Sequence, residues 1–393
     1  MTGNPATNAF VFAGNPVIFR YQCSAALADH RVVVRPFILI ESTIYDLPET
    51  YTEPDGSLIA TFNLSEVLTK AFDRIIEALP GPGNTIEEIK KSIGYVGLYV
   101  TEVGGTPIAT EDEVIEYLYA IRGGIAWQHA PTLQYLDVYQ PSNKLFLTWQ
   151  PNEQRVTPDQ YVYLPYLQRL TNTTWAVEVK SYDESGVLLG TLTPFSVTGA
   201  TIAVINAIPA GFTQLGIAAQ AYAASVARYT VQVKNGGDVY SELRTFYLDR
   251  KYYRNVRYFQ FTNSIGGFDS IYTTGETEQV SELNRQTVEV YQPNAYVVGL
   301  GQRRVREFLE QDIFKVNTGY ALRPELDNLR AALLSGKVGQ LLPIRTSSGS
   351  SAAWVPVEIV GSQIKRSRDN EFLHFLELEM RYLFVNAYHT PAP

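Results

Sequence analysis

Residues 250–275, RKYYRNVRYFQFTNSIGGFDSIYTTG, constrain the fold more than any other stretch of the chain. Segment 256–262 alternates aromatic, β-branched and polar side chains between two faces, which favours a strand. Segment 263–267 then supplies turn residues, because glycine accepts a positive φ and asparagine can bond nearby backbone. Segment 268–274 alternates again. The stretch predicts a buried β-hairpin whose structural residues are Phe259, Phe261, Asn263, Gly266 and Gly267.

The same loop has a second interpretation, as a ligand-binding loop built on Asn263 and Asp269. No histidine and no second acidic cluster lies close to it in the sequence. The structural hairpin is therefore the preferred interpretation, and Asp269 is assigned no chemistry.

Short strand-like segments recur between residues 145 and 233, separated by turn residues. Segment 175–182 alternates cleanly behind Trp175. A spacing of roughly 8–12 residues between such segments is typical of an immunoglobulin or fibronectin-like β-sandwich. The chain has a single cysteine, so an antibody-like disulfide core is excluded. A spacer or docking role is preferred here over ligand binding at the loops.

The N-terminal region mixes strand and helix patterns. Segments 17–22, 31–43 and 93–103 are strand-like. Asn63 precedes an apolar stripe that predicts a helix over residues 63–79, with Glu66 three residues after the cap. A second, short acidic helix is predicted over residues 110–121.

The C-terminal region is also mixed. Strands are predicted over residues 288–300, 354–360 and 372–384. Segment 301–311 has a partly helical pattern, and Pro324 at a first turn predicts a helix over residues 322–334.

A length of 393 residues exceeds what one core of ordinary size covers, so several domains are expected. The predicted fold is mainly β with some helix (α+β) and is built from β-sandwich modules. The shifts in pattern divide the chain into a flexible arm (1–15), an N-terminal α+β or sandwich domain (16–130), an immunoglobulin or fibronectin-like β-sandwich (131–250) and a C-terminal β-rich docking domain with the aromatic hairpin (251–393).

Composition and charge favour a protein that assembles with others. Aromatic residues make up 12% of the chain and charged residues only 18%, which fits a β-rich protein with partly covered surfaces. Residues 1–130 hold 16 acidic and 8 basic side chains, a difference equal to the whole formal net charge of −8. This acidic head suits head-to-tail contacts between subunits, and plain solvated surface explains it equally well. No block is basic enough to predict nucleic-acid binding.

Targeting and cysteine signals are sparse. Residues 1–19 lack a basic segment followed by a long apolar run, so no signal peptide is expected. The chain has no uninterrupted run of about 18 apolar residues, so no membrane insertion is expected. Cys23, the single cysteine, excludes a disulfide framework or a cysteine-built zinc site and is expected to be a small buried residue on a strand. It is compatible with folding in a reducing cytoplasm.

Candidate chemistry is weak throughout the sequence. The glycine-rich segments lack the dinucleotide and phosphate-loop patterns, and no G-x-S-x-G motif occurs. The histidines lie far apart, without metal-ligand spacing: His30, His129, His374 and His389. We therefore expect no catalytic residue, no cofactor and no bound metal. A glycosidase pair drawn from distant carboxylates stays open.

The segments NSIGGFDSIYTTGE and WVPVEIVGSQIKRSRDNEFLHFLELEMRYLF resemble structural proteins from the tail modules of phages and prophages of Bacteroidota. Those proteins are tail-tip, baseplate or fibre-attachment components. The resemblance covers the last third of the chain and transfers no functional residue. It implies a virion tail protein that is made in the cytoplasm of the host bacterium.

Three functions remain open from the sequence. The preferred one is a non-enzymatic structural component of a phage tail or a related contractile machine, which binds other copies of itself and neighbouring tail proteins. The second is a carbohydrate-binding β-sandwich protein that recognises a host glycan through exposed aromatic residues. The third is a glycan-cleaving tail enzyme, which needs two carboxylates roughly 5–10 Å apart in a pocket.

Overall fold

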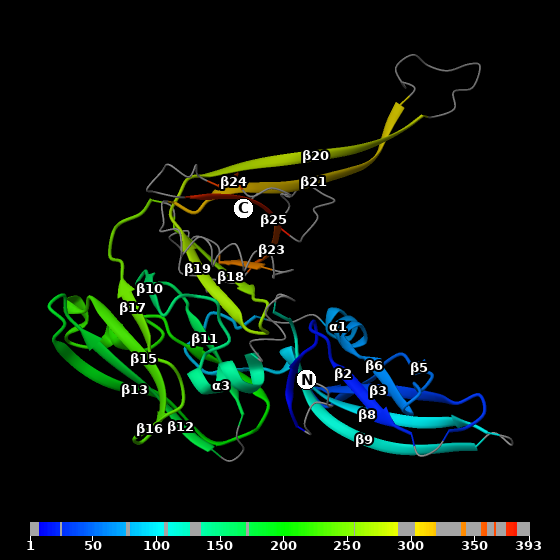
Figure 1. Ribbon diagram of the computed structural model, residues 1–393. Helices are drawn as coiled ribbons and strands as arrows, with labels where there is room; N and C mark the ends of the chain where they lie inside the picture. Colours follow the sequence, from blue (N-terminus) through cyan, green and yellow to red (C-terminus); the bar gives the residue numbers. More distant parts are fainter. Residues whose placement is uncertain are drawn as a thin grey trace, which may run out of the picture.

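The computed structural model describes residues 8–23, 26–75, 79–105, 109–125, 135–169, 173–254, 256–289, 303–319, 339–342, 355–359, 365–366 and 375–382 (Figure 1). Several β-sheets dominate these residues, which confirms the prediction of a mainly β chain with some helix. Figure 1 shows an N-terminal part at lower right, a central part at lower left and a C-terminal sheet above both. No helix among the described residues combines the length and apolarity needed to cross a membrane.

The N-terminal part is built from two sheets and one helix. A six-stranded sheet has the order β1 (Phe10–Phe12), β9 (Ala109–Ile121), β8 (Ile93–Gly104), β3 (Arg31–Ile40) and β4 (Thr43–Asp46), and β5 (Thr50–Thr52) also pairs with β3. A two-stranded sheet, β2 (Ile18–Gln22) with β6 (Ile59–Asn63), and helix α1 (Ser65–Asp73) supply the rest of the core. The expected arm of residues 1–15 thus contributes β1, a strand parallel to β9.

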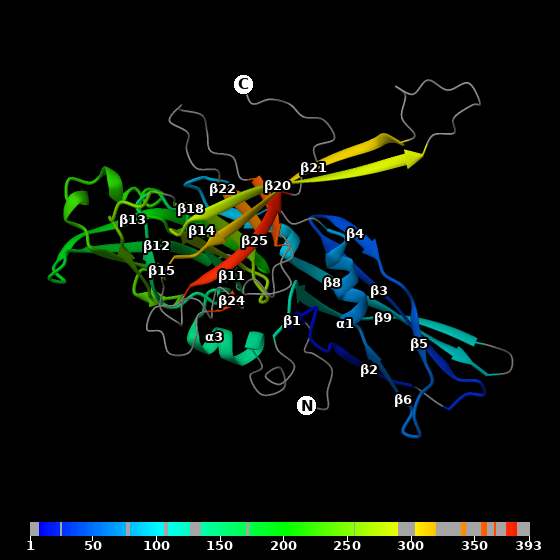
Figure 2. The same ribbon diagram turned by 90° about the horizontal axis from the view of Figure 1, so that it is seen from above.

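Helix α1 forms where the sequence predicts a helix, although it is shorter. The N-cap is Leu64, where the sequence predicts Asn63, and this cap has no side-chain hydrogen bond. The side chain of Asn63 instead accepts a hydrogen bond from the backbone N of Ser65, the first helical residue, at 3.1 Å. Leu64, Leu68 and Phe72 are buried along one stripe of the helix and join the N-terminal core. Figure 2 shows α1 lying across the six-stranded sheet.

The helix predicted over residues 110–121 is wrong, because these residues form β9. Strand β9 pairs with β8 from Ala109 opposite Gly104 to Ile121 opposite Ile93. A Thr-x-x-Glu sequence, Thr110 to Glu113, imitates a helix cap at its start. The β-branched and aromatic residues that follow favour a strand once a partner strand is available.

The central part contains two facing sheets. A six-stranded sheet has the order β10 (Glu153–Val156), β17 (Arg244–Leu248), β15 (Arg228–Asn235), β12 (Thr173–Tyr182) and β13 (Leu188–Ala200), and β16 (Asp238–Val239) pairs with β15. A three-stranded sheet has the order β11 (Tyr163–Gln168), β14 (Val204–Pro209) and β7 (Glu87–Ile89). Their core holds Phe146, Trp175, Tyr229 and Phe246. Because β7 precedes β8 in the chain, the N-terminal segment contributes a strand to the central part.

The helical segments described in and beside the central part are all short. They are η1 (Lys90–Ser92), η2 (Tyr135–Tyr139), α3 (Gln140–Asn143), η3 (Ile217–Ala219) and η4 (Ala223–Ser225).

The C-terminal part is one eight-stranded sheet. Its order is β19 (Phe268–Thr273), β18 (Arg257–Thr262), β22 (Gly339–Leu342), β23 (Val355–Ile359), β25 (Leu376–Tyr382), β21 (Arg303–Asn317) and β20 (Thr277–Glu289), and β24 (Lys365–Arg366) pairs with β25. The strands predicted over residues 354–360 and 372–384 are confirmed by β23 and β25. The partly helical interpretation of segment 301–311 is wrong from residue 303 onward, because β21 pairs along β20. The strand predicted over 288–300 is described only at its first two residues, the end of β20, and the helix predicted over 322–334 lies outside the described residues.

Strands β20 and β21 form a long ribbon that leaves the body of the molecule in both views (Figures 1 and 2). They pair from Thr277 opposite Val316 to Glu289 opposite Arg303, with one irregularity after Gln286. Strand β25 pairs with β21 only over residues 313–317. Within the described residues, the outer part of the ribbon therefore has no third strand.

A junction core joins the three parts of the molecule. It contains side chains from the N-terminal part (Phe10, Phe12, Ile93, Ile121), from the central part (Leu147, Tyr163, Ile205) and from the β18–β19 hairpin (Ile265, Phe268). The turn of the hairpin thus packs where the other two parts meet.

Candidate functional site

The first candidate site is the hairpin predicted from the sequence. Strands β18 and β19 pair antiparallel from Arg257 opposite Thr273 to Thr262 opposite Phe268. Residues 263–267 form the turn, and Ile265 within it is fully buried in the junction core. The sequence therefore predicts both the hairpin and its burial.

Asn263 closes the turn and anchors it. Its side-chain oxygen accepts hydrogen bonds from the backbone N of Ile265 at 3.1 Å and of Gly267 at 2.9 Å. Its side-chain nitrogen donates to the carbonyl of Leu147 at 2.8 Å. All the polar atoms of one buried side chain are thus used, and they join the hairpin to the central part.

Both glycines of the turn are required, for different reasons. Gly266 has a φ of +79°, the left-handed conformation expected of at least one glycine here. A Cβ on Gly266 would also lie 2.7 Å from the carbonyl oxygen of Arg122. A Cβ on Gly267 would overlap the carbonyl oxygen of Leu147. Gly267 is therefore needed for a close approach between two backbones.

The two phenylalanines of β18 are buried. Phe259 belongs to a C-terminal core with Phe314, Val316, Val357, Leu378 and Met380. Phe261 is also buried. Gln260, which points to the opposite face, is fully buried as well, so both faces of β18 are covered.

Residues after the turn add polar links to segment 147–151. Asp269 is fully buried and accepts a hydrogen bond from the hydroxyl of Thr148. Burial raises the pKa of Asp269 to about 6, while the bonds from Thr148 and Asn263 and the charge of Arg244 act in the opposite direction. The side chain of Gln150 donates to the carbonyl of Ser270. The sequence around Asp269 contains no pattern that would predict the burial of this side chain.

Arg244 holds the same segment from the central part. Its Nη1 donates to the carbonyls of Gln150 at 2.7 Å and Pro151 at 2.9 Å. Its Nη2 lies 2.9 Å from Oε1 of Glu242, and burial lowers the pKa of the guanidinium. These groups bond one another, so the arrangement can hold the segments together.

Other links bring the N-terminal part to the turn. The backbone N of Gly124 donates to the carbonyl of Ser264 at 2.6 Å. The indole N of Trp149 donates to the hydroxyl of Ser264 at 2.8 Å. The ring of Phe268 packs edge-on against Tyr163, with centroids 6.2 Å apart. The hairpin turn therefore contacts both of the other parts.

A small groove opens beside this junction. It is lined by segments 13–14, 69–73, 122–124 and 262–267 and has a volume of about 250 Å³. Sites for small molecules usually span about 300–1,000 Å³. The groove is thus smaller than a usual glycan or cofactor site.

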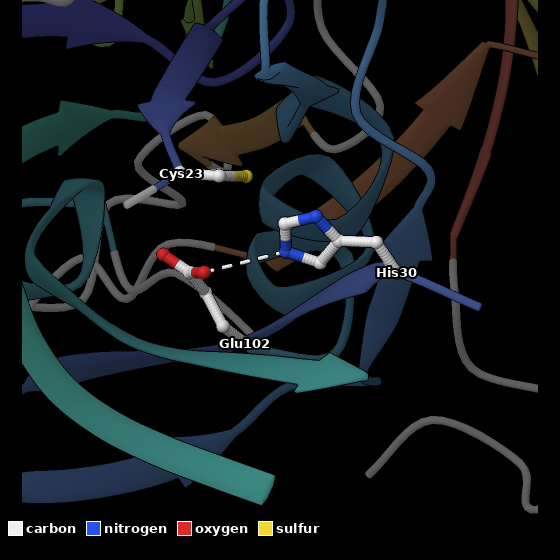
Figure 3. A group of neighbouring side chains, drawn as sticks. All are labelled: Cys23, His30 and Glu102. Atoms are coloured by element: carbon white, nitrogen blue, oxygen red, sulfur yellow. Dashed lines mark hydrogen bonds and ion pairs between the residues drawn. The ribbon is translucent and has the colours of Figure 1, made fainter. Parts of the chain in front are cut away.

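A second candidate site lies in the N-terminal part, where no local pattern of the sequence indicates one. Figure 3 shows Cys23, His30 and Glu102 side by side, with the two ring nitrogens of His30 on the side of the thiol and the carboxylate. One ligand atom from each residue lies within 4.8 Å of the other two. Nε2 of His30 is 3.3 Å from Oε2 of Glu102. Cys23 is buried as expected, directly after β2.

This cluster is the only group of three such ligands among the described residues. The other histidines of the sequence, His129, His374 and His389, lie outside those residues. Glu102 lies more than 70 positions from both Cys23 and His30 in the chain, so no local spacing rule could connect the three.

Comparison with known proteins adds no relative to these observations. No protein-family model matches the chain, and no curated protein matches it.

Proposed function

We propose that this chain is a non-enzymatic structural component of a phage tail, at the tip, the baseplate or the fibre-attachment point, or of a related contractile machine. It assembles through contacts with other copies of itself and with neighbouring tail proteins, and it works in the virion. The β20–β21 ribbon is the observation that carries this proposal.

The ribbon supports an assembly role because, among the described residues, its outer part pairs with no third strand. Isolated two-stranded hairpins are marginally stable in water, and a third strand or a packed face is needed. Strand β25 supports β21 only over residues 313–317. Val280 and Val288 on β20 are exposed. A partner that covers the ribbon would supply the missing burial.

The rest of the molecule suits a rigid base for such a ribbon. Strand β20 follows directly after β19, whose hairpin is fixed to both other parts by Asn263, Ser264 and Asp269. The chain therefore runs from the anchored hairpin directly into the ribbon.

The central part supports the same role as an immunoglobulin or fibronectin-like module. The strand order β17-β15-β12-β13, facing β11 and β14, supports this proposal because it is similar to the GFC-containing sheet of that fold with one added strand. Trp175 is fully buried on β12, where such domains carry a core tryptophan. The hydroxyl of Tyr229 on β15 donates to the carbonyl of Ala210 at 2.9 Å, which links β15 to the end of β14 in the facing sheet. Modules of this kind commonly serve as spacers or docking units.

Imaging and ribbon removal test the assembly role. We expect the purified chain to form rings or stacks visible by negative-stain electron microscopy, and to run as an oligomer in light scattering. Replacing residues 281–312 by a short Gly-Ser linker keeps the segment that pairs with β25 and should give a folded monomer. A matched control shortens the exposed turn 184–186 between β12 and β13, and should still assemble.

Two results would contradict the proposal. One is a wild-type chain that stays monomeric at high concentration, alone and with neighbouring tail proteins. The other is turnover of a polysaccharide that a single carboxylate substitution abolishes in a folded protein, which would indicate a glycan-cleaving enzyme.

A further inference from the structure

Sheet register places an acid in the hydrophobic layer of the N-terminal part. Glu102 on β8 is opposite Val32 on β3, and Val100 is opposite Val34. Residues opposite each other in a ladder share one face of the sheet, and Val32, Val34 and Val100 all belong to the N-terminal core. The Glu102 side chain is therefore directed into that layer, and it is only 5% exposed.

Cys23 and His30 reach this carboxylate from the ends of two neighbouring strands. His30 immediately precedes β3, two residues before the partner of Glu102. Cys23 immediately follows β2, and its backbone N donates to the carbonyl of Leu58 at 2.9 Å. Three different elements thus hold the three side chains.

Of the two ring nitrogens of His30, one has a hydrogen-bond partner and the other has none. The side chain of His30 is 8% exposed, and its Nε2 contacts Glu102. Its Nδ1 is buried without any hydrogen-bond partner. A buried polar atom without a partner costs free energy. The nitrogen placed to bind an ion together with Glu102 is Nε2, which faces the carboxylate. The thiol and the carboxylate lie on the nitrogen side of the same ring (Figure 3).

The donor set and its spacing fit a transition metal. Thiolate, imidazole and carboxylate are the three donor types that zinc uses in proteins. Nitrogen and oxygen ligands at about 2.0–2.2 Å from a tetrahedral zinc ion lie about 3.3–3.5 Å apart. The 3.3 Å between Nε2 of His30 and Oε2 of Glu102 agrees with that value. The remaining separations between the three ligand atoms are all within 4.8 Å.

Charge balance supports the same assignment. A thiolate and a carboxylate carry two negative charges, and the imidazole ligand is neutral. A divalent cation neutralises the set, so that no net charge is left buried in the core. The thiol proton leaves for solvent on binding, as is usual for cysteine ligands.

Against the expectation of no bound metal from the sequence, we propose that Cys23, His30 and Glu102 bind one divalent transition-metal ion of the zinc type. The ion ties the ends of β2 and β3 to β8, and a fourth position is left for water.

Metal titration of the purified full-length chain tests this site. After removal of metal with a chelator, we expect the protein to bind one equivalent of Zn²⁺ and to melt at a higher temperature, an effect that the chelator reverses. With Co²⁺ as the probe, we expect thiolate-to-cobalt charge-transfer absorption in the near ultraviolet and the strong visible bands of tetrahedral cobalt.

Three ligand variants and one control complete the experiment. Cys23→Ser should abolish the thiolate band, and His30→Gln and Glu102→Gln should weaken binding by more than about 100-fold, since changes around a metal site that spare the ligands already cost 10–100-fold. Glu66→Gln removes an exposed carboxylate from α1 and should bind as the wild type does. Near-ultraviolet circular dichroism confirms that each variant is folded.

If the variants fail to fold, metal binding by the wild-type protein alone tests the proposal. Less than about a tenth of an equivalent of bound Zn²⁺ or Co²⁺ in the folded wild type would overturn the proposal. A cobalt complex without thiolate absorption, or unchanged affinity in folded Cys23→Ser, would do the same.

Discussion

Gly266 and Gly267 are neighbours in the hairpin turn, and substitution should reveal their different roles. Gly266→Ala forces a side chain into the left-handed region, which costs roughly 1–2 kcal/mol, and adds the contact with the carbonyl of Arg122. Gly267→Val should cost more, because the backbone of Leu147 must move. We expect both variants to unfold at lower urea concentration, and Gly267→Val to be insoluble or unable to assemble.

Gly237 provides the matched control for both glycines. It lies in an exposed turn, and a Cβ there meets nothing within 4 Å. Gly237→Ala should therefore leave the free energy of unfolding within about 0.5 kcal/mol of the wild type. If Gly267→Val were as well tolerated as Gly237→Ala, the packing of the turn against segment 147–151 would be wrong.

Asp269 should make stability depend on pH in the direction opposite to most carboxylates. Its pKa is raised from 3.8 to about 6 by burial, so the folded state holds the proton more tightly than the unfolded state. The contribution of Asp269 to the free energy of unfolding is therefore fully present below about pH 4 and is lost as the pH rises through about 6. Each unit of the shift corresponds to about 1.4 kcal/mol.

Urea unfolding at pH 5 and pH 7 measures this effect. Asp269→Asn should remove the contribution, so the variant gains less stability than the wild type between pH 7 and pH 5. Asp159→Asn, at an exposed position, should keep the wild-type pH dependence. Loss of assembly in a stable Asp269→Asn protein would instead indicate that the hairpin is a binding site.

At the scale of single elements, the β18–β19 hairpin depends on its buried rings. Phe261→Ala and Phe259→Ala should each destabilise the protein by about 3–5 kcal/mol, the usual cost of removing a core phenylalanine. The expected outcome is insoluble protein or a strongly lowered melting temperature. Tyr252→Ala, at a position 91% exposed, is the control and should be silent. Normal melting of Phe261→Ala would contradict the burial of this face of β18.

Local patterns predict an element well when its own residues decide its structure. The hairpin is decided by alternation and by Asn263, and α1 by an apolar stripe after Asn63. Strands β9 and β21 are decided instead by pairing with β8 and β20, which outweighs local helix signals such as Thr110 with Glu113. The Cys23–His30–Glu102 cluster is similarly non-local, because register alone brings Glu102 to His30.

At the scale of the whole molecule, the three parts share a core and strands. Strand β7 of the N-terminal segment pairs with β14 of the central part, and Ile89 on β7 is buried in the junction core. Phe10, Phe12 and Ile121 are buried in the same core. The boundary predicted near residue 130 therefore separates segments of the chain that stay packed together.

A fragment of residues 1–125 tests this shared core. Without the rest of the chain it would expose the side chains of the junction core and leave β7 unpaired, so we expect it to aggregate and to melt without a cooperative transition. Co-expression with residues 126–393 should restore a soluble complex, because the missing faces are then supplied in trans. Circular dichroism melting and size-exclusion chromatography measure both. A soluble monomeric fragment that melts near the temperature of the full chain would mean that the N-terminal part is an independent domain, and that its contacts with β14 and the hairpin turn contribute little to its stability.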